Sequence, residues 1–382
     1  MRRVAVVLFN LGGPDAPEAV RPFLENLFTD PAILRVPGFV RPWLGRFIAA
    51  RRTKAATENY AILGGRSPLL ELTEEQGRAL DAALNPGGAA GGEEYRSFVA
   101  MRYWHPFSDE AARAVRDWGA AEVLLLPLYP QYSTTTTGSS IAAWDDAAKA
   151  AGLDLPTTTL CCWHSDGGFA AATAALVRGA WEKARAELPP ETGLRVLFSA
   201  HGLPESIVKR GDPYQWQVER TVAAVVEALG MEGLDHQVCY QSRVTPQRWI
   251  GPSTEEALEA AAHDGVAALV CPIAFVSEHS ETLVELDVEY REAAEKMGVP
   301  GYFRVPAQNS DAGFIAALAA LVRRARGSGR ALCSFAGARQ CPKPFGDCPH
   351  AKAGGGASAQ PPPRGPAWSR GPGSARRTRR SR

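Results

Sequence analysis

The sequence predicts an α/β protein with two domains, each built on a doubly wound parallel sheet. Short apolar runs bounded by Gly or Pro alternate with longer, alanine-rich stretches of helical spacing. Runs that are apolar on both faces and alternate with helices are typical of a parallel sheet covered on both sides. The 382 residues are enough for two ordinary hydrophobic cores. The sequence is therefore that of a doubly wound α/β protein.

The individual elements follow from this pattern. The predicted strands are Val4–Phe9, Phe98–Tyr103, Val123–Leu128, Arg195–Ser199, Val238–Tyr240, Ala267–Pro272 and Tyr302–Val305. The stretches with helical spacing include Ala170–Glu187, Gln215–Leu229 and Thr254–Asp264.

A weak internal duplication supports two similar domains. Val7–Pro14 resembles Val196–Pro204, since each is a strand that breaks into a Gly/Pro loop. Leu126–Tyr129 resembles Cys271–Phe275 in the same way. Because ligands bind outside the carboxyl ends of such strands, two domains that face each other would share one site. The alternative is a chance similarity between common strand–turn sequences.

The charge is distributed unevenly along the chain. Residues 351–382 hold eight basic and no acidic residues, so the other 34 basic and 41 acidic residues give the body a formal charge of −7. A mildly acidic body argues against a nucleic-acid-binding protein, which needs a basic face. The segment from Gly354 onward is rich in Gly, Pro, Ser and Arg and is expected to be disordered, because it cannot bury enough apolar surface.

No targeting or membrane-spanning segment is predicted. The N-terminal apolar stretch is short and runs into Asn10 and the Gly/Pro loop. No stretch approaches the roughly 18 apolar residues that cross a bilayer. A cytoplasmic location is therefore expected. The seven cysteines are then interpreted as buried thiols or metal ligands rather than disulfides.

The densest group of candidate functional residues follows the predicted strand that ends near Pro272. A helix is predicted from about Ser280, which would place Glu281, Glu285 and Glu289 on one helix face. Like charges at this spacing cost a few tenths of a kcal/mol per pair. A row of carboxylates could conduct cations or protons. The alternative is a solvated acidic face.

His201 is the second candidate because it directly follows a predicted buried strand. Imidazole is the side chain whose ordinary titration straddles neutrality, so it can take up protons or bind a metal. The alternative is a structural histidine.

Several motifs together resemble the ferrochelatase family, collinearly from about Val4 to Val322. They are Arg51–Thr53 with Tyr60 and Gly64–Pro68, Tyr129–Ser133 with Thr137–Ser140, Phe198–Pro204, Gln241–Val244 with Trp249–Pro252, and Pro272–Glu289. The resemblance implies two Rossmann-like domains that enclose a porphyrin cleft. It also implies an enzyme of haem biosynthesis that inserts Fe²⁺ into a distorted porphyrin, protoporphyrin IX favoured, with release of two protons.

The resemblance also divides the chain. Residues 1–155 are expected to form the first Rossmann-like domain and residues 156–306 the second. Residues 307–330 are expected to form a helix that returns to the first domain. Residues 331–350 would form a Cys-rich cluster-binding segment, and residues 351–382 a disordered basic tail.

The resemblance assigns roles to individual residues. His201 and Glu281 become the catalytic pair that also handles the substrate iron, while which of them takes the protons stays open. Asp287 would extend the acidic line. The substrate-binding positions are Asn10, Leu11, Arg52, Tyr60, Ser67, Arg102, Ser242, Trp249, Phe275, His279 and Glu285. Arginine suits the porphyrin propionates and aromatic groups suit the ring faces. A family lysine falls at Ala55 here, one place from Lys54.

Three cysteines, Cys333, Cys341 and Cys348, lie in a segment rich in Gly and Pro. Their spacing matches neither a zinc ribbon nor a ferredoxin. The resemblance implies a [2Fe–2S] cluster with these three ligands and one from the body. A zinc site or free thiols are the alternatives.

The body ligand of the animal type would fall at Thr134 and is absent. Cys161 or Cys162 is the expected substitute, because both lie in a predicted loop. Cys239 and Cys271 lie in predicted strands and are expected to be inert core residues.

The segment Ile33–Ala50 mixes large apolar residues with arginines. By analogy with the family it is a lip over the cleft that contacts the inner membrane peripherally; alternatively, it is an amphipathic helix that covers a core.

A serine hydrolase and a non-catalytic porphyrin carrier are the alternative functions. The sequence has no G-x-S-x-G motif, which argues against a serine hydrolase. A porphyrin carrier would not need both His201 and Glu281. Coproporphyrin, another tetrapyrrole or another metal remains an alternative substrate, and the protein would be a monomer or a homodimer.

Overall fold

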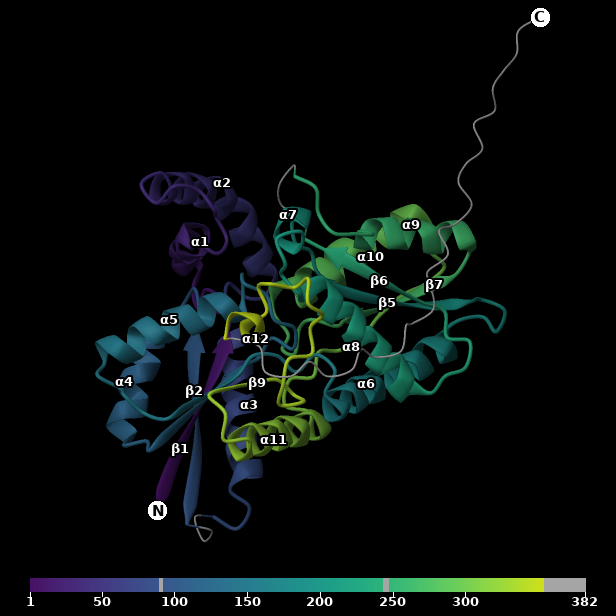
Figure 1. Ribbon diagram of the computed structural model, residues 1–382. Coiled ribbons are helices and arrows are strands. Elements are labelled where there is room, and N and C mark those ends of the chain that lie inside the picture. The colour runs from purple at the N-terminus through teal and green to yellow at the C-terminus, as the bar shows by residue number, and fades with distance from the viewer. Residues whose placement is uncertain (89–91, 243–246, 354–382) are drawn as a thin grey trace, which may run out of the picture.

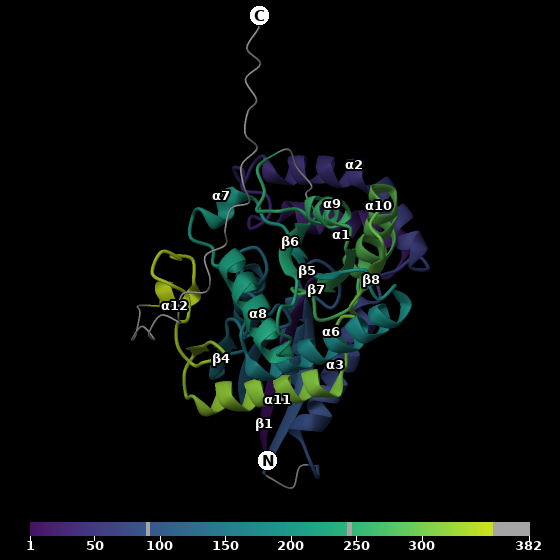
Figure 2. The same ribbon diagram turned by 90° about the vertical axis from the view of Figure 1, so that its right-hand side faces the viewer.

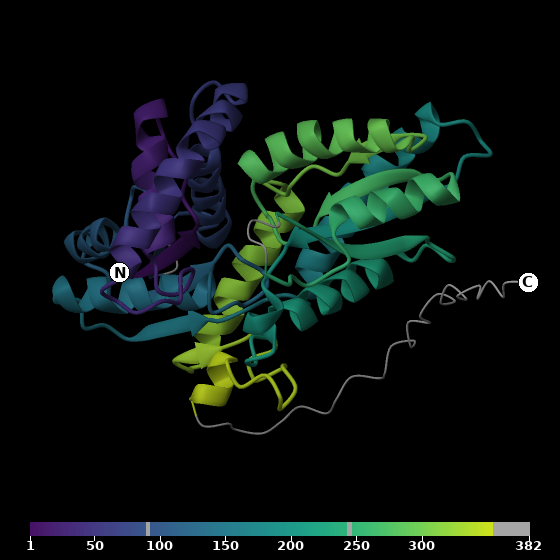
Figure 3. The same cartoon turned by 90° about the horizontal axis from the view of Figure 1, so that it is seen from above.

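The computed structural model describes residues 1–88, 92–242 and 247–353, and it contains two parallel sheets with helices around them (Figure 1). The predicted basic tail from Gly354, and Arg243 and Val244 of one predicted motif, lie outside the described residues. Seen from above, the chain forms an N-terminal lobe and a second lobe beside it (Figure 3).

The first sheet has the strand order β2-β1-β3-β4-β9, and all its pairings are parallel. Its strands are β1 (Arg2–Asn10), β2 (Glu93–Met101), β3 (Glu122–Pro127), β4 (Thr157–Leu160) and β9 (Leu332–Cys333). The strands β4 and β9 were not predicted from the sequence.

Helices cover both faces of this sheet because strand β1 is apolar on both sides. Val6 and Leu8 pack against the helices α3 (Leu69–Leu84) and α11 (Ala312–Gly327). The alternate residues of β1 pack against α4 (Ser108–Trp118) and α5 (Thr137–Ala150) on the other face.

The second sheet has the order β6-β5-β7-β8 and is also parallel. Its strands are β5 (Leu194–His201), β6 (His236–Gln241), β7 (Ala267–Pro272) and β8 (Tyr302–Arg304). The helices α6 (Gly167–Glu187) and α8 (Tyr214–Leu229) cover one face. The helices α9 (Thr254–Asp264) and α10 (Tyr290–Met297) cover the other. The predicted fold class, two parallel-sheet α/β domains, is confirmed.

The C-terminal part of the chain returns to the first sheet. Helix α11 packs its apolar face against that sheet, and it lies below α6 in Figure 2. Strand β9 then adds to the edge of the sheet, where Leu160 pairs with Cys333. The short helix α12 (Pro349–Lys352) follows and continues two residues into the segment that the sequence assigned to the disordered tail.

Two helices form a separate layer above the first sheet in Figure 1. They are α1 (Val20–Thr29), preceded by the 3₁₀ turn η1 (Pro17–Ala19), and α2 (Arg41–Ile62). They approach closely at Gly45, where an added Cβ would lie 2.7 Å from the Phe28 carbonyl oxygen. No helix in the described part of the chain is long and apolar enough to cross a membrane.

The helix predicted from about Ser280 has an unusual form. Residues Glu281–Glu289 form the π-helix η3, which continues directly into α10. A π-helix has i→i+5 hydrogen bonds, is rare, and is found frequently at functional sites. The short helix α7 (Glu205–Val208) completes the second domain.

Candidate active site

The site forms where strands of the second sheet end. His201, the last residue of β5, pairs in register with Gln241, the last residue of β6. Strand β7, on the other side of β5, ends at Pro272 and leads into the loop before the π-helix. Because parallel strands end at one edge of the sheet, these segments meet at the usual ligand position of such folds.

The predicted catalytic pair is in direct contact. The Nδ1 atom of His201 lies 2.8 Å from Oε2 of Glu281. The Nε2 atom of His279 lies 3.9 Å from the other oxygen of Glu281, beyond hydrogen-bond length. Phe275 packs on His279 with 4.6 Å between the ring centroids. The structure therefore brings four of the predicted site residues together.

The shifts in pKa favour the charged forms of both His201 and Glu281, although burial opposes them. Burial alone would lower the pKa of His201, but the carboxylate of Glu281 outweighs it, so the pKa is raised. Burial alone would raise the pKa of Glu281, but His201 outweighs it and the pKa is lowered. Burial lowers the pKa of His279, which favours the neutral imidazole. The site thus combines an imidazolium–carboxylate pair with a second, neutral imidazole.

Glu285, one helix turn further, is tied to the end of β6 and to α10. Ser242 donates to its Oε2 atom at 2.6 Å, and Tyr290 donates to its Oε1 atom at 3.2 Å. Burial, followed by the charge of Glu281, raises the pKa of Glu285. Ser242 has a φ of 66°, which is rare for a residue with a side chain. Such strain is concentrated at functional sites.

The acidic row ends at the surface. Glu289 is exposed, and Asn59 of helix α2 donates to it at 3.4 Å. Asp287, expected to extend the row, is instead bound by Arg304 through two hydrogen bonds, of 2.6 and 2.8 Å. That expectation was wrong, because the side chain of Asp287 is held by strand β8.

Several predicted substrate-binding residues of the first domain lie together. Asn10 is buried at the end of β1, and its side chain accepts from Leu11 N at 2.9 Å. A Cβ added to Gly13 would lie 2.5 Å from Ser67 and 3.8 Å from the hydroxyl of Tyr60. The structure thus places this group at the carboxyl end of the first sheet.

Tyr60 links this group to the second domain. Ser280 lies 3.5 Å from its hydroxyl, at the start of the π-helix. Burial raises the pKa of Tyr60 to about 12, and the charge of Glu281 contributes. The residues predicted from the two domains therefore approach one another at this point.

The predicted propionate ligands differ in their surroundings. Arg102 is engaged inside the protein, because its guanidinium donates to Ser139 at 2.7 Å and pairs with Asp30 at 2.8 Å. Arg52 is exposed on helix α2. Trp249 lies beside the residue that follows His201, since a Cβ added to Gly202 would meet its ring at 3.3 Å.

Comparison with known proteins then decides the family. The family model described as Ferrochelatase matches residues 3–326. The chain belongs to the ferrochelatase family. A curated ferrochelatase of Caulobacter vibrioides (strain NA1000 / CB15N) is 50% identical over 348 residues, which cover 91% of this chain and 97% of that protein.

Two further relatives agree with this assignment. A ferrochelatase of Hyphomonas neptunium is 50% identical over 92% of this chain and 96% of its own length. A ferrochelatase of Phenylobacterium zucineum is 52% identical over 83% of this chain and 90% of its own length. Among solved structures, "SirB from Bacillus subtilis with Fe3+" has a TM-score of 0.46 and 11% identity, over 85% of this chain and 96% of that chain. The resemblance read from the sequence is confirmed at the level of the ferrochelatase family, and with it the prediction of an enzyme.

Some residues of this candidate site were given no role from the sequence. Gln241 is fully buried; its side chain lies 3.4 Å from Glu281 and 3.3 Å from Glu285 and accepts from Ser199 at 2.8 Å. Its signal was available, because it follows the predicted strand Val238–Tyr240 and opens the motif Gln241–Val244. Tyr290 and Arg304 had no such signal.

The predicted cluster ligands lie apart from the candidate active site: Cys161 and Cys162 directly follow strand β4, and the other three lie on the edge strand β9 and in the segment beyond it. All five cysteines are buried. The sulfur atoms of Cys161 and Cys162 are 3.5 Å apart, and Cys161 N donates to the Cys333 carbonyl oxygen at 2.8 Å. In the described ranges no three His, Cys, Asp or Glu side chains converge closely enough to hold a metal ion.

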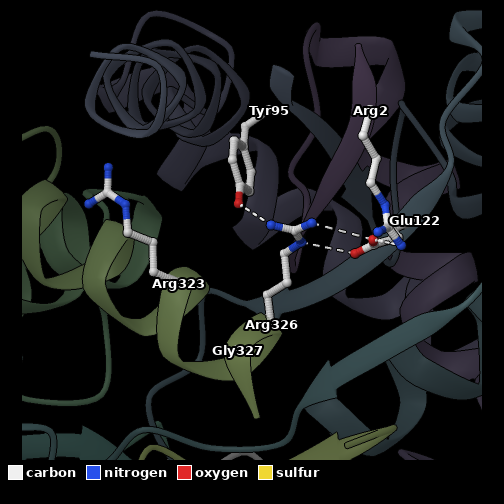
Figure 4. A pocket seen from close by; sticks show the side chains of 6 residues that line it. All are labelled: Arg2, Tyr95, Glu122, Arg323, Arg326 and Gly327. Carbon is white, nitrogen blue, oxygen red and sulfur yellow. Dashed lines mark hydrogen bonds and ion pairs between the residues drawn. The ribbon is translucent and has the colours of Figure 1, made fainter. Parts of the chain in front are cut away.

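Two cavities lie elsewhere in the protein. One, of about 460 Å³, lies where the strands of the first sheet begin (Figure 4). There Arg326 forms ion pairs with Glu93 and Glu122, and Figure 4 shows its guanidinium between Tyr95 and Glu122. The other, of about 480 Å³, lies beside Asp81. Neither is lined by a residue of the predicted ferrochelatase site.

Proposed function

We propose that the protein is a ferrochelatase that inserts Fe²⁺ into a porphyrin, with protoporphyrin IX as the favoured substrate. The observation that carries this proposal is the contact of 2.8 Å between His201 and Glu281 at the strand ends. Family membership supports it as well. A porphyrin carrier would have no need for this partly buried ion pair.

The reaction explains why nitrogen and oxygen donors are needed together. Two pyrrole N–H protons leave the porphyrin as Fe²⁺ enters, and the iron exchanges its water ligands. Imidazole and carboxylate groups bind Fe²⁺ in place of water. They are also proton acceptors. His201 and Glu281 therefore act as one unit that takes up protons and handles the substrate iron.

Glu285 and Glu289 provide a route for protons from His201 and Glu281 toward solvent. The raised pKa of Glu285 makes it a proton acceptor closer to neutrality than an ordinary carboxylate. Glu289 is exposed and lies one further turn along the π-helix. A proton that reaches Glu285 can therefore be passed toward solvent.

The ring is placed by residues from both domains. Its nitrogen lone pairs lie in the ring plane, so insertion requires a site that binds the bent ring better than the flat one. Tyr60 and Trp249 supply aromatic contacts, and Arg52 supplies a cation for a propionate.

An anaerobic incubation of the purified protein with Fe²⁺ and either protoporphyrin or coproporphyrin tests this function. Absorbance should show conversion of the porphyrin to the iron complex, faster with protoporphyrin. Glu295→Gln, at an exposed position of the following helix α10, is the matched control for Glu281→Gln and should retain turnover. Porphyrin binding without iron insertion would support a carrier instead.

We also propose a [2Fe–2S] cluster held by Cys333, Cys341, Cys348 and either Cys161 or Cys162. Such a cluster takes four thiolates, and this group provides five buried thiols. A hydrogen bond to Cys161 raises the pKa of Cys162 and one to Cys348 raises the pKa of Cys341; burial and the charges of neighbouring thiols act in the same direction, so bare thiolates would repel one another here. A bound cluster would supply a one-electron redox centre.

The contacts that the Cys-rich segment makes with the body of the protein support the cluster proposal. Gln217 of helix α8 donates to the Cys341 sulfur at 3.1 Å, and hydrogen bonds to sulfur are usual around such clusters. Asp347 N donates to the Gly211 carbonyl oxygen at 3.1 Å. A Cβ on Gly211 would lie 2.8 Å from Gly346 N, so the segment fits closely against the body.

Finally, we propose that the surface around α2 contacts a membrane peripherally. Phe39, Trp43 and Phe47 follow one another at intervals of four residues and are 83%, 79% and 57% exposed. Arg51 lies over the Phe47 ring, 5.0 Å from its centroid. Apolar side chains next to cations are typical of helices that lie on anionic lipid.

Flotation with vesicles that contain anionic phospholipid tests this contact. Trp43→Ser should reduce the bound fraction severalfold. Ile62→Ser, at the other end of the same helix and also exposed, is the control and should not change it. Equal binding by both variants would contradict the assignment.

A further inference from the structure

Strand β8 contacts the π-helix that carries Glu281 and Glu285 on the side opposite His201. The hydroxyl of Tyr302 donates to the Leu286 carbonyl oxygen at 2.6 Å. Arg304 binds Asp287 through Nε at 2.6 Å and Nη2 at 2.8 Å, one bond to each carboxylate oxygen. Leu286 and Asp287 thus face β8, whereas Glu281 and Glu285 contact His201 and Ser242 on the opposite side.

The same guanidinium also binds the loop before the π-helix. Its third nitrogen, Nη1, donates to Glu278 Oε1 at 2.8 Å. That carboxylate oxygen in turn accepts from Ala307 N at 2.9 Å. Since Glu278 precedes His279 and Asp287 follows Glu285, one side chain fastens both ends of the segment that carries these site residues.

The chemistry of the contact explains why arginine is used. The guanidinium is a planar fork that can bind two carboxylates in fixed directions, which a lysine ammonium cannot do. The side chains of Arg304 and Glu278 are only 12% and 11% exposed, so solvent screens the contact little. A π-helix is a rare backbone form, so its position depends on such tertiary contacts.

We propose that Arg304 is a positioning residue that sets the distance between Glu281 and His201 by joining Glu278 to Asp287. This inference rests on the proposed iron insertion, because its effect is on the chemical step. Arg304 need not touch porphyrin or iron. Its replacement should therefore slow turnover while porphyrin binding is retained.

Arg195 provides a matched control. It lies at the start of β5, whose other end is His201, and it also binds two carboxylates: Asp235 and Asp264, each at 2.9 Å. Its side chain is 15% exposed, similar to that of Arg304. Arg195→Lys therefore breaks a similar clamp in the same sheet, far from the site.

The experiment measures kcat, the KM for porphyrin, the porphyrin Kd by fluorescence, and the Tm of both variants. Arg304→Lys should lower kcat about 10- to 100-fold, since a displacement near 1 Å can cost that much. Its KM and Kd for porphyrin should stay within about twofold of wild type. Arg195→Lys should lower the Tm alone.

Asp287→Asn keeps Arg304 bound to Glu278 and is the second variant should Arg304→Lys not fold. It should show the same loss in kcat at unchanged porphyrin Kd. Wild-type kcat in these variants, or an equal loss in Arg195→Lys, would overturn the positioning role. Absence of iron insertion by the wild type would instead overturn the proposed function.

Discussion

The imidazole of His201 and the carboxylate of Glu281 are in contact at 2.8 Å, although 80 residues separate them in the sequence. Strand β5 delivers the first and the π-helix delivers the second. Gln241 and Ser242, at the end of β6, lie within 3.4 Å of the same carboxylate oxygen. Three separate segments thus converge on one carboxylate.

Removing either member of this pair should abolish iron insertion. His201→Ala and Glu281→Gln should each lower kcat by at least about 100-fold, the range of a lost proton-transfer group. Porphyrin should still bind, because neither side chain supplies much ring contact. Anaerobic turnover and porphyrin fluorescence titration measure the two effects separately. Near-normal turnover in either variant would refute the catalytic role.

The stability contributed by the pair should depend on pH. The pKa of His201 is raised above its ordinary 6.5, so this contribution is complete below pH 6.5 and is lost as the pH rises through the raised value. The pKa of Glu281 is lowered below its ordinary 4.5, so its contribution is present above pH 4.5 and is lost as the pH falls through the lowered value. Both contributions are complete between these two ordinary values.

We therefore expect wild type to exceed His201→Gln in unfolding free energy most clearly within that window. The difference should be about 1 kcal/mol, because the His201 side chain keeps 36% exposure to screening solvent. Urea unfolding at a series of pH values measures it. A difference that grows above neutrality would contradict the raised pKa.

Replacing Gln241 should affect both stability and turnover. Gln241→Leu removes one hydrogen-bond partner from Ser199 and from the carboxylates of Glu281 and Glu285, which should cost about 1–3 kcal/mol. The kcat should fall about tenfold, because Glu281 and Glu285 lose a shared neighbour. Gln237→Leu, earlier on β6, is the control for strand stability and should leave kcat unchanged. Equal effects of the two variants would show that Gln241 is only structural.

The cluster proposal predicts coloured protein after anaerobic purification, with about two irons and two sulfides per chain. Cys341→Ser should bleach it, and so should one of Cys161→Ser and Cys162→Ser. Cys271→Ser, in strand β7, is the control and should keep the colour. The bleached variants should also have a lower Tm, because metal-binding energy adds to folding energy. Colourless protein with bound zinc and no sulfide would refute the cluster.

The sequence predicted the fold class well because the central strands are apolar on both faces. Strand β1 is an example: Val4 through Phe9 are all buried. The strands that it missed lacked this signal. Strand β4 consists largely of half-buried threonines, and β9 is two residues long. Their pairing is set by the return of the chain to the first sheet, which local sequence does not encode.

The same limit applies to the site. His201 and Glu281 were found from their motifs, and Glu285 from its spacing. The spacing could not distinguish an α-helix from a π-helix, because the i→i+5 pattern depends on contacts such as Tyr302 with Leu286. Asp287 was misassigned because its side chain is bound by a residue that the local spacing does not reveal. Its partner Arg304 is 17 residues away and on a strand.

The position of α11 has a consequence for synthesis on the ribosome. This helix covers Val6 and Leu8 of strand β1, yet it begins only at Ala312, far along the chain. Until it emerges, the growing chain lacks the helix that covers one apolar face of its first sheet. The N-terminal half therefore cannot reach its final packing as an autonomous unit before α11 has been synthesised.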